Sequence, residues 1–259
     1  MPSIPRPARN SLPAPAVRDF RGMLDAALNA RDEHGRQWSD ARWGCYAFYD
    51  YDGEPIYVGQ TNERLRARVR RHLTNQRTDA VAMRILDVFE VAEMELWPLW
   101  EFEDVAGKRH PDYAAAQQRL NAVEYTAYLK AIRESRFKAI LNEKIPPVSP
   151  TIDLPTSGRF PLISDATRRE RGHPDIRIAR RAETISRLAA VAHERGEVSD
   201  GLRRVLVIQG VRLAYIAAVR LAYAEGRPTP DPSAIDVTGL VGSVLFEHED
   251  NPGLFDADG

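Results

Sequence analysis

The stretch Gly44–His72 reads GCYAFYDYDGEPIYVGQTNERLRARVRRH, and it decides the fold. It begins with a short aromatic, β-prone run, continues through the turn signal Asp52-Gly53, and returns in a second β-prone run over 54–59. Two such runs around a short turn predict a β-hairpin. Apolar residues then recur at helical spacing over 62–75, and Asn62 can cap a helix at its start. The stretch therefore predicts a hairpin followed directly by an amphipathic helix.

On both sides of this stretch, the sequence predicts further helices and one more strand. The expected elements are helices over 19–31, 78–89 and 113–138 and a third strand over 91–99. With the hairpin they give an α+β fold in which a small three-stranded antiparallel sheet is flanked by helices. Farther along, the periodicity predicts a mainly helical C-terminal region with a helical hairpin over 176–195 and 202–225, and 235–246 fits either a strand or a helix.

Two proline-rich stretches and an acidic end divide the chain. We expect a flexible arm over 1–16, an α+β domain over 17–145, a proline-rich linker over 146–165, a helical C-terminal domain over 166–246 and an acidic tail over 247–259.

The composition limits the partners and the cellular compartment that we expect for the protein. The 259 residues include 36 Lys and Arg against 37 Asp and Glu, so no global basic field attracts nucleic acid, although a local basic face can do so. Cys45 is the single cysteine, which excludes an internal disulfide and favours a reducing compartment. The most apolar stretch carries Arg212 and Arg220, which argues against a membrane span. We therefore expect a soluble protein of the bacterial cytoplasm with no membrane association.

Side chains suited to phosphate chemistry gather in the opening stretch. Tyr46 and Tyr57 stand on the two arms of the hairpin, and Gly59 ends its second arm, where a backbone or a ligand can approach closely. Arg68 and His72 are four residues apart and share one helix face. The same helix carries four further arginines that are candidates for nucleic-acid backbone contact, namely Arg64, Arg66, Arg70 and Arg71.

This pattern resembles the GIY-YIG endonuclease superfamily over roughly residues 42–145. The two tripeptides of that family stand here as Gly44-Cys45-Tyr46 and Tyr57-Val58-Gly59, and its Leu-x-x-Arg helix stands as Leu65-Arg66-Ala67-Arg68. The resemblance implies that Glu124 is the acidic metal ligand and that Asn142 is the asparagine near the end of the module. Cys45 departs from the usual aliphatic residue, and the 18-residue gap from Glu124 to Asn142 is longer than expected.

The resemblance also implies a reaction, the hydrolysis of phosphodiester bonds in DNA with Mg²⁺ or Mn²⁺. A single carboxylate, Glu124, suits a hard divalent cation that keeps water and phosphate ligands. Arg68 can hold the scissile phosphate through its planar fork. Tyr46 is a candidate general base with Tyr57 as its hydrogen-bonding partner, and His72 can instead accept or relay the proton. The sequence does not choose between Tyr46 and His72. Restriction or phage defence is the biological role that we expect.

Two other readings stay open at this point. In the first, the protein binds nucleic acid without cleaving it and uses the fold as a platform. In the second, residues 170–246 mediate homodimerisation and the first half of the chain is a scaffold. A second basic run over 168–181 is either a solvated helix start or a contact to the DNA backbone.

Overall fold

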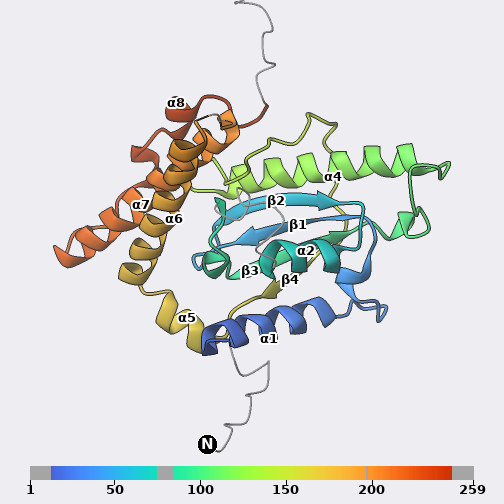
Figure 1. Ribbon diagram of the computed structural model, residues 1–259, viewed down its shortest axis with the longest axis horizontal. Coiled ribbons are helices and arrows are strands. Elements are labelled where there is room, and N and C mark those ends of the chain that lie inside the picture. The colour runs from blue at the N-terminus through green and yellow to red at the C-terminus, as the bar shows by residue number, and fades with distance from the viewer. Residues whose placement is uncertain (1–12, 75–84, 197, 247–259) are drawn as a thin grey trace, which may run out of the picture.

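A four-stranded antiparallel sheet forms the centre of the protein (Figure 1). We describe it from a computed structural model, in which residues 13–74, 85–196 and 198–246 are described. The strands are β1 (Gly44–Tyr49), β2 (Pro55–Thr61), β3 (Glu93–Pro98) and β4 (Gly158–Pro161), in the order β2-β1-β3-β4. The predicted α+β class and the hairpin of β1 and β2 are confirmed.

The predicted number of three strands is wrong, because β4 adds a fourth strand at the edge of the sheet beside β3. It lies in the proline-rich segment. A strand of only four residues among prolines has too short an alternating pattern to be predicted from sequence. Pro161 pairs with Glu93 at the end of the ladder, a position where a missing N–H group is tolerated. The residue before it, Phe160, packs edge-on against Trp38 at 6.4 Å between ring centroids. Part of the expected linker is therefore a component of the sheet.

The helices cover the sheet on several sides (Figure 1). The α-helices are α1 (Pro15–Asn29), α2 (Leu65–Thr74), α4 (Tyr113–Glu134), α5 (Asp165–Arg171), α6 (Pro174–Arg195), α7 (Asp200–Ala224) and α8 (Val237–Val241). Single 3₁₀ turns lie at Trp38–Asp40, Val88–Glu90, Trp100–Phe102 and Pro232–Ala234. Every residue of the central strand β1 is buried. Leu65, Val69 and Leu73 are the buried residues of α2, and their spacing fixes which face of this helix is turned inward.

Several element boundaries differ from the prediction. α1 begins at Pro15, within the expected arm, because proline suits the first turn of a helix. α2 begins at Leu65, and Asn62 donates a hydrogen bond to the Tyr113 hydroxyl at 3.3 Å instead of capping the helix. The ambiguous segment 235–246 contains the short helix α8 and no strand. Most of the helix expected over 78–89, and the arm and tail over 1–12 and 247–259, lie outside the described residues.

α7 is the most apolar helix. It is long and apolar enough to cross a membrane, judged by length and composition alone, and 33% of its most apolar window is buried. Core helices of soluble proteins meet the same test. α7 lies alongside α6 as the second half of the helical hairpin at one end of the sheet (Figure 1).

A buried ion cluster attaches this hairpin to the sheet. Asp50 directly follows β1, and its Oδ2 atom accepts hydrogen bonds from Arg177 at 3.1 Å, Arg181 at 2.9 Å and Arg212 at 2.8 Å. Glu90 lies 3.5 Å from Arg177 and 3.3 Å from Arg181 on the other side. Asp50 and Arg212 are 1% and 2% exposed. The three arginines keep the pKa of the Asp50 carboxyl below its usual value despite its burial.

At Arg177 and Arg181, the second basic run is therefore neither a solvated helix start nor a DNA contact. Arg177 and Arg181 are buried in the ion cluster, and Arg168 donates to the Tyr51 carbonyl and to Glu93. Their carboxylate acceptors Asp50, Glu90 and Glu93 lie more than 70 residues away in the chain, so local sequence gives no sign of them.

Candidate active site

Two glycines shape the floor of the site. Tyr46 on β1 pairs with Gly59 on β2, and a Cβ atom on residue 59 would lie 2.7 Å from the Tyr46 hydroxyl oxygen. The phenol therefore occupies the space that a side chain at 59 would need. Gly44 has another role, because a Cβ atom there would lie 2.6 Å from the Trp97 carbonyl oxygen and 2.8 Å from Leu65 Cδ1. Gly44 thus lets α2 pack closely on the sheet, and Gly59 makes room for the Tyr46 side chain.

α2 brings two polar side chains to the Tyr46 hydroxyl. Arg68 Nε donates a hydrogen bond to Tyr46 Oη at 3.3 Å, and His72 Nδ1 lies 3.3 Å from the same oxygen. Arg68 and His72 are one helical turn apart, next to the buried stripe of α2, so both reach one point above the sheet. The structure thus brings Tyr46, Arg68 and His72 together.

Aromatic rings enclose His72. Tyr57 stacks against Tyr46 at 6.2 Å between ring centroids and meets the imidazole edge-on at 4.9 Å. Phe48 approaches the same imidazole at 5.6 Å. Sequence reasoning missed Phe48, although a signal for it exists, because residues two apart in a strand point to the same face and Phe48 follows Tyr46 at that spacing.

The enclosure changes how these groups ionise. Burial, together with the nearby charges of Arg68 and Arg71, lowers the pKa of His72 to about 4. Burial raises the pKa values of Tyr46 and Tyr57, while Arg68 opposes the rise. At neutral pH the imidazole is therefore neutral and both phenols are protonated. A neutral His72 can accept the hydroxyl proton of Tyr46 while Arg68 donates to the same oxygen.

Glu124 approaches the site from α4. Its side chain is 8% exposed and makes no hydrogen bond or ion pair within the described residues. Burial raises its pKa to about 7, and the charge of Arg68 acts in the opposite direction. The carboxylate in turn raises the pKa of Tyr46, Tyr57 and Cys45, so it lies within electrostatic range of both tyrosines. The structure thus places Glu124 near the Tyr46 and Arg68 pair.

A buried carboxylate with no protein partner in the described part of the chain fits a hard divalent cation. An oxygen donor of this kind suits Mg²⁺ or Mn²⁺, and Mg²⁺ commonly keeps several waters when it binds one or two carboxylates. Within the described ranges, no group of three or more His, Cys, Asp or Glu side chains gathers that could hold a metal. A cation at Glu124 would therefore take its other ligands from water and substrate.

The side chain of Asn142 hydrogen-bonds to the backbone of β2. Its Oδ1 atom accepts a hydrogen bond from Val58 N at 3.0 Å, and its Nδ2 atom donates to Val58 O at 2.7 Å. Next to it, Leu141 N donates to Ile56 O at 2.8 Å. The Asn142 amide is 5% exposed and bonds on both ends to the free edge of β2. The structure therefore places Asn142 against the strand between Tyr57 and Gly59, where it holds the backbone in position.

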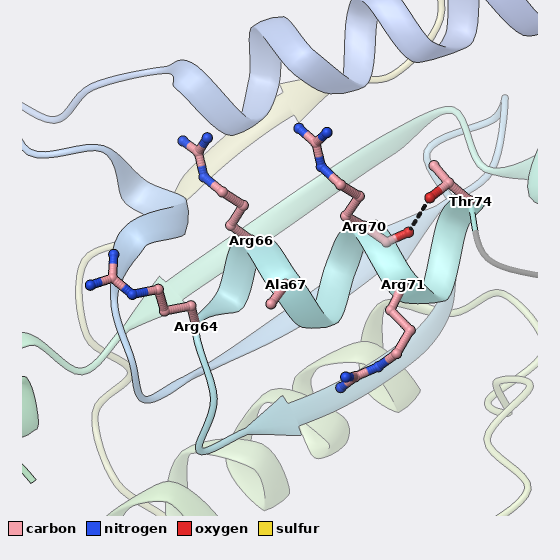
Figure 2. A pocket seen from close by; sticks show the side chains of 6 residues that line it. All are labelled: Arg64, Arg66, Ala67, Arg70, Arg71 and Thr74. Atoms are coloured by element: carbon pink, nitrogen blue, oxygen red, sulfur yellow. Dashed lines mark hydrogen bonds between the residues drawn. The ribbon is translucent and has the colours of Figure 1, made fainter. Parts of the chain in front are cut away.

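Arg64, just before α2, and the three additional arginines of α2 line a surface groove with Ala67 and Thr74, and these four arginines point in different directions (Figure 2). Arg66 donates to Leu28 O at 2.9 Å and to Gln37 Oε1 at 2.6 Å and also pairs with Asp40. Arg70 pairs with Asp25 on α1 at 2.7 Å.

The other two arginines face away from α1. Arg71 pairs with Glu63 at 2.8 Å in the loop before α2. Arg64 is exposed and has no ion pair in the described part of the chain. The set predicted to bind nucleic acid thus divides into two arginines that tether α2 to the N-terminal segment and two that lie on its outer side.

Comparison with known proteins supports the resemblance that the sequence predicts for the hairpin and α2. Residues 42–102 match the family model of the GIY-YIG catalytic domain, which confirms the predicted resemblance over the hairpin, α2 and β3. Glu124 and Asn142 lie beyond the matched residues. No curated protein and no solved structure matches the chain.

Proposed function

We propose that this protein is a metal-dependent endonuclease that hydrolyses phosphodiester bonds in DNA. The GIY-YIG module is of the nuclease type. One observation carries the proposal: Arg68 Nε and His72 Nδ1 each lie 3.3 Å from Tyr46 Oη, and the Glu124 carboxylate, which has no partner among the described residues, lies near them. A proton acceptor, a fixed cation and a hard oxygen ligand are the groups that phosphodiester hydrolysis requires.

Arg68 is the group that we assign to the phosphate. In the part of the chain that the structure describes, the side chain of Arg68 hydrogen-bonds only through Nε, so its terminal nitrogens can donate to two phosphate oxygens in a fork. Its positive charge would offset the negative charge that develops on the phosphoryl oxygens during attack. The hydrogen bond to Tyr46 fixes the plane of the guanidinium before substrate arrives.

The proton route uses Tyr46 and His72 together. The attacking water gives its proton to the Tyr46 oxygen as the phenol proton passes to the neutral His72. Arg68 stabilises negative charge on the phenol oxygen during this transfer. The low pKa of His72 limits its strength as a base, and a phosphate bound at Arg68 would raise that pKa by offsetting the positive charge nearby.

Glu124 is the residue that we assign to the cation. A bound Mg²⁺ or Mn²⁺ would supply stabilisation of the leaving oxygen. The chain contributes the carboxylate itself from α4, and Gln60 of β2 donates a side-chain hydrogen bond to Asn121 on the same helix at 3.3 Å. We assign contact with the DNA backbone to Arg64 and Arg71, because Arg66 and Arg70 are bonded to the N-terminal segment.

A second candidate function is a nucleic-acid-binding platform that does not cleave. The observation that favours it is the complete burial of Tyr46, which is 0% exposed. In this reading the phenol is only part of the core, and the outer arginines of α2 do the binding.

The experiment that separates the two is a nicking assay on supercoiled plasmid with Mg²⁺ or Mn²⁺, beside a gel-shift assay in chelator. We expect cation-dependent nicking by the natural protein and loss of nicking with retained binding in Glu124→Gln. Glu134→Gln, an exposed change on the same helix, is the matched control and should nick normally. Binding without nicking under either cation would support the platform and contradict the nuclease.

The raised pKa of Glu124 predicts a pH-dependent stability that does not involve cleavage. With a folded-state pKa of about 7 against 4.5, the folded protein holds a proton that the unfolded chain releases. The stability that this proton confers is present below pH 4.5 and is lost as the pH rises through 7. We therefore expect Glu124→Gln, in chelator, to unfold at a higher temperature than the natural protein at pH 8 and at a similar one at pH 5. Equal shifts at both pH values would contradict this assignment.

A further inference from the structure

The outer face of α7 carries a regular apolar stripe. Its members alternate four and three residues apart, the spacing of a coiled-coil seam, and they are Val207, Gly210, Ala214, Ala217, Leu221 and Ala224. Val207 and Leu221 are 38% and 53% exposed, although both are large apolar side chains. Within the described residues this stripe has no covering element, which is unusual for so long an apolar helix face.

The stripe is not needed for the fold of the single chain. The residues of α7 that pack inward are on its other side, among them Val205, Ile208 and Arg212. A Cβ atom built on Gly210 would meet nothing within 4 Å. A second helix can therefore approach the outward face closely, because the small side chains of Gly and Ala allow a short distance between helix axes.

Charges at the two ends of the stripe indicate which helix can pack on it and in which direction. Asp200 and Arg203 are exposed at the start of α7, and Glu225 and Arg227 are exposed just beyond its end. Ala214 lies eleven residues from both Arg203 and Glu225. An antiparallel copy of α7 centred on Ala214 therefore sets Arg203 opposite Glu225 of the copy at both ends, and Asp200 within one position of Arg227. A parallel copy would set like charges together.

We propose that α7 is a dimerisation helix that pairs antiparallel with α7 of a second copy of this chain. The contact is isologous: Ala214 meets its own symmetry mate on the two-fold axis, and every other residue of the stripe faces the position equally far from Ala214 on the other side. Val207 meets Leu221 of the copy, the small residues meet at the centre, and the charged residues close the two ends. Antiparallel alignment also sets opposite ends of the helix dipoles together.

The test is sedimentation equilibrium of the full chain at micromolar concentrations. We expect a dimer for the natural protein and a monomer for Ala214→Arg, which places two like charges at the axis. Arg203→Glu and Glu225→Arg should each weaken the dimer, and the double variant should restore it because the facing charges are exchanged. Glu170→Arg, an exposed change on α5, is the matched control and should remain dimeric.

Circular dichroism should be unchanged in all these variants, because every altered residue is exposed. The proposal is overturned by a natural protein that stays monomeric, by a dimer that survives Ala214→Arg, or by a double charge exchange that fails to restore association. None of these outcomes depends on cleavage of DNA.

Discussion

Arg68→Lys should lower the rate of plasmid cleavage by roughly 100-fold or more while leaving the fold intact. Lysine keeps the positive charge but loses the planar fork, so it can neither hold two phosphate oxygens in one plane nor keep the Nε bond to Tyr46 Oη. The measurement is single-turnover cleavage at saturating protein, which reports the chemical step separately from binding.

Arg64→Lys is the matched control for this change. Arg64 directly precedes α2, four residues before Arg68, is exposed, and has no ion pair in the part of the chain that the structure describes. Because an exposed lysine can still contact a backbone phosphate as a point charge, we expect a change of no more than about threefold. Equal losses in the two variants would mean that Arg68 acts through general charge and not through its position at Tyr46.

Asp50→Asn should lower the free energy of unfolding by about 3–5 kcal/mol, the usual cost of removing one partner from a buried ion pair. Asparagine keeps the shape of the side chain and an oxygen for the turn amides of Asp52 and Glu54. It removes the charge on which Arg177, Arg181 and Arg212 converge. Urea unfolding followed by tryptophan fluorescence provides the measurement.

The matched control in this case is Asp52→Asn. Asp52 bonds to the same Arg177 at 2.8 Å, but its side chain is 45% exposed, so water screens the pair and the expected loss is below about 1 kcal/mol. A loss at Asp50 as small as that at Asp52 would show that burial does not set the strength of this cluster.

The part of the site that sequence predicts best is the part that is local. Tyr46, Tyr57, Arg68 and His72 lie within a stretch short enough for strand alternation and helical spacing to place them on one side of the hairpin. The structure indeed brings these four together. Glu124 needed the family resemblance, since an acid on a long helix has no spacing signal of its own.

What sequence could not predict depends on distant partners. Arg64 and Arg66 are two residues apart in the same basic run, yet one is exposed and the other is bonded to the last turn of α1 and to the segment after it. The direction of α1 decides this difference, and no local pattern encodes it. β4 was missed for a similar reason, because a four-residue edge strand takes its form from β3 and not from its own proline-rich sequence.

The Asp50 cluster also bears on how such a chain can be recombined in evolution or by design. The proline-rich segment looks like a natural junction, at which the C-terminal helices could be exchanged for those of another protein. Such a chimaera would leave the Asp50 carboxylate buried without its three cations, because all of them come from α6 and α7. Asp50 in the β-hairpin and the three arginines of α6 and α7 must therefore be inherited together. The part of the chain before the proline-rich segment and the helices after it thus evolve as one unit.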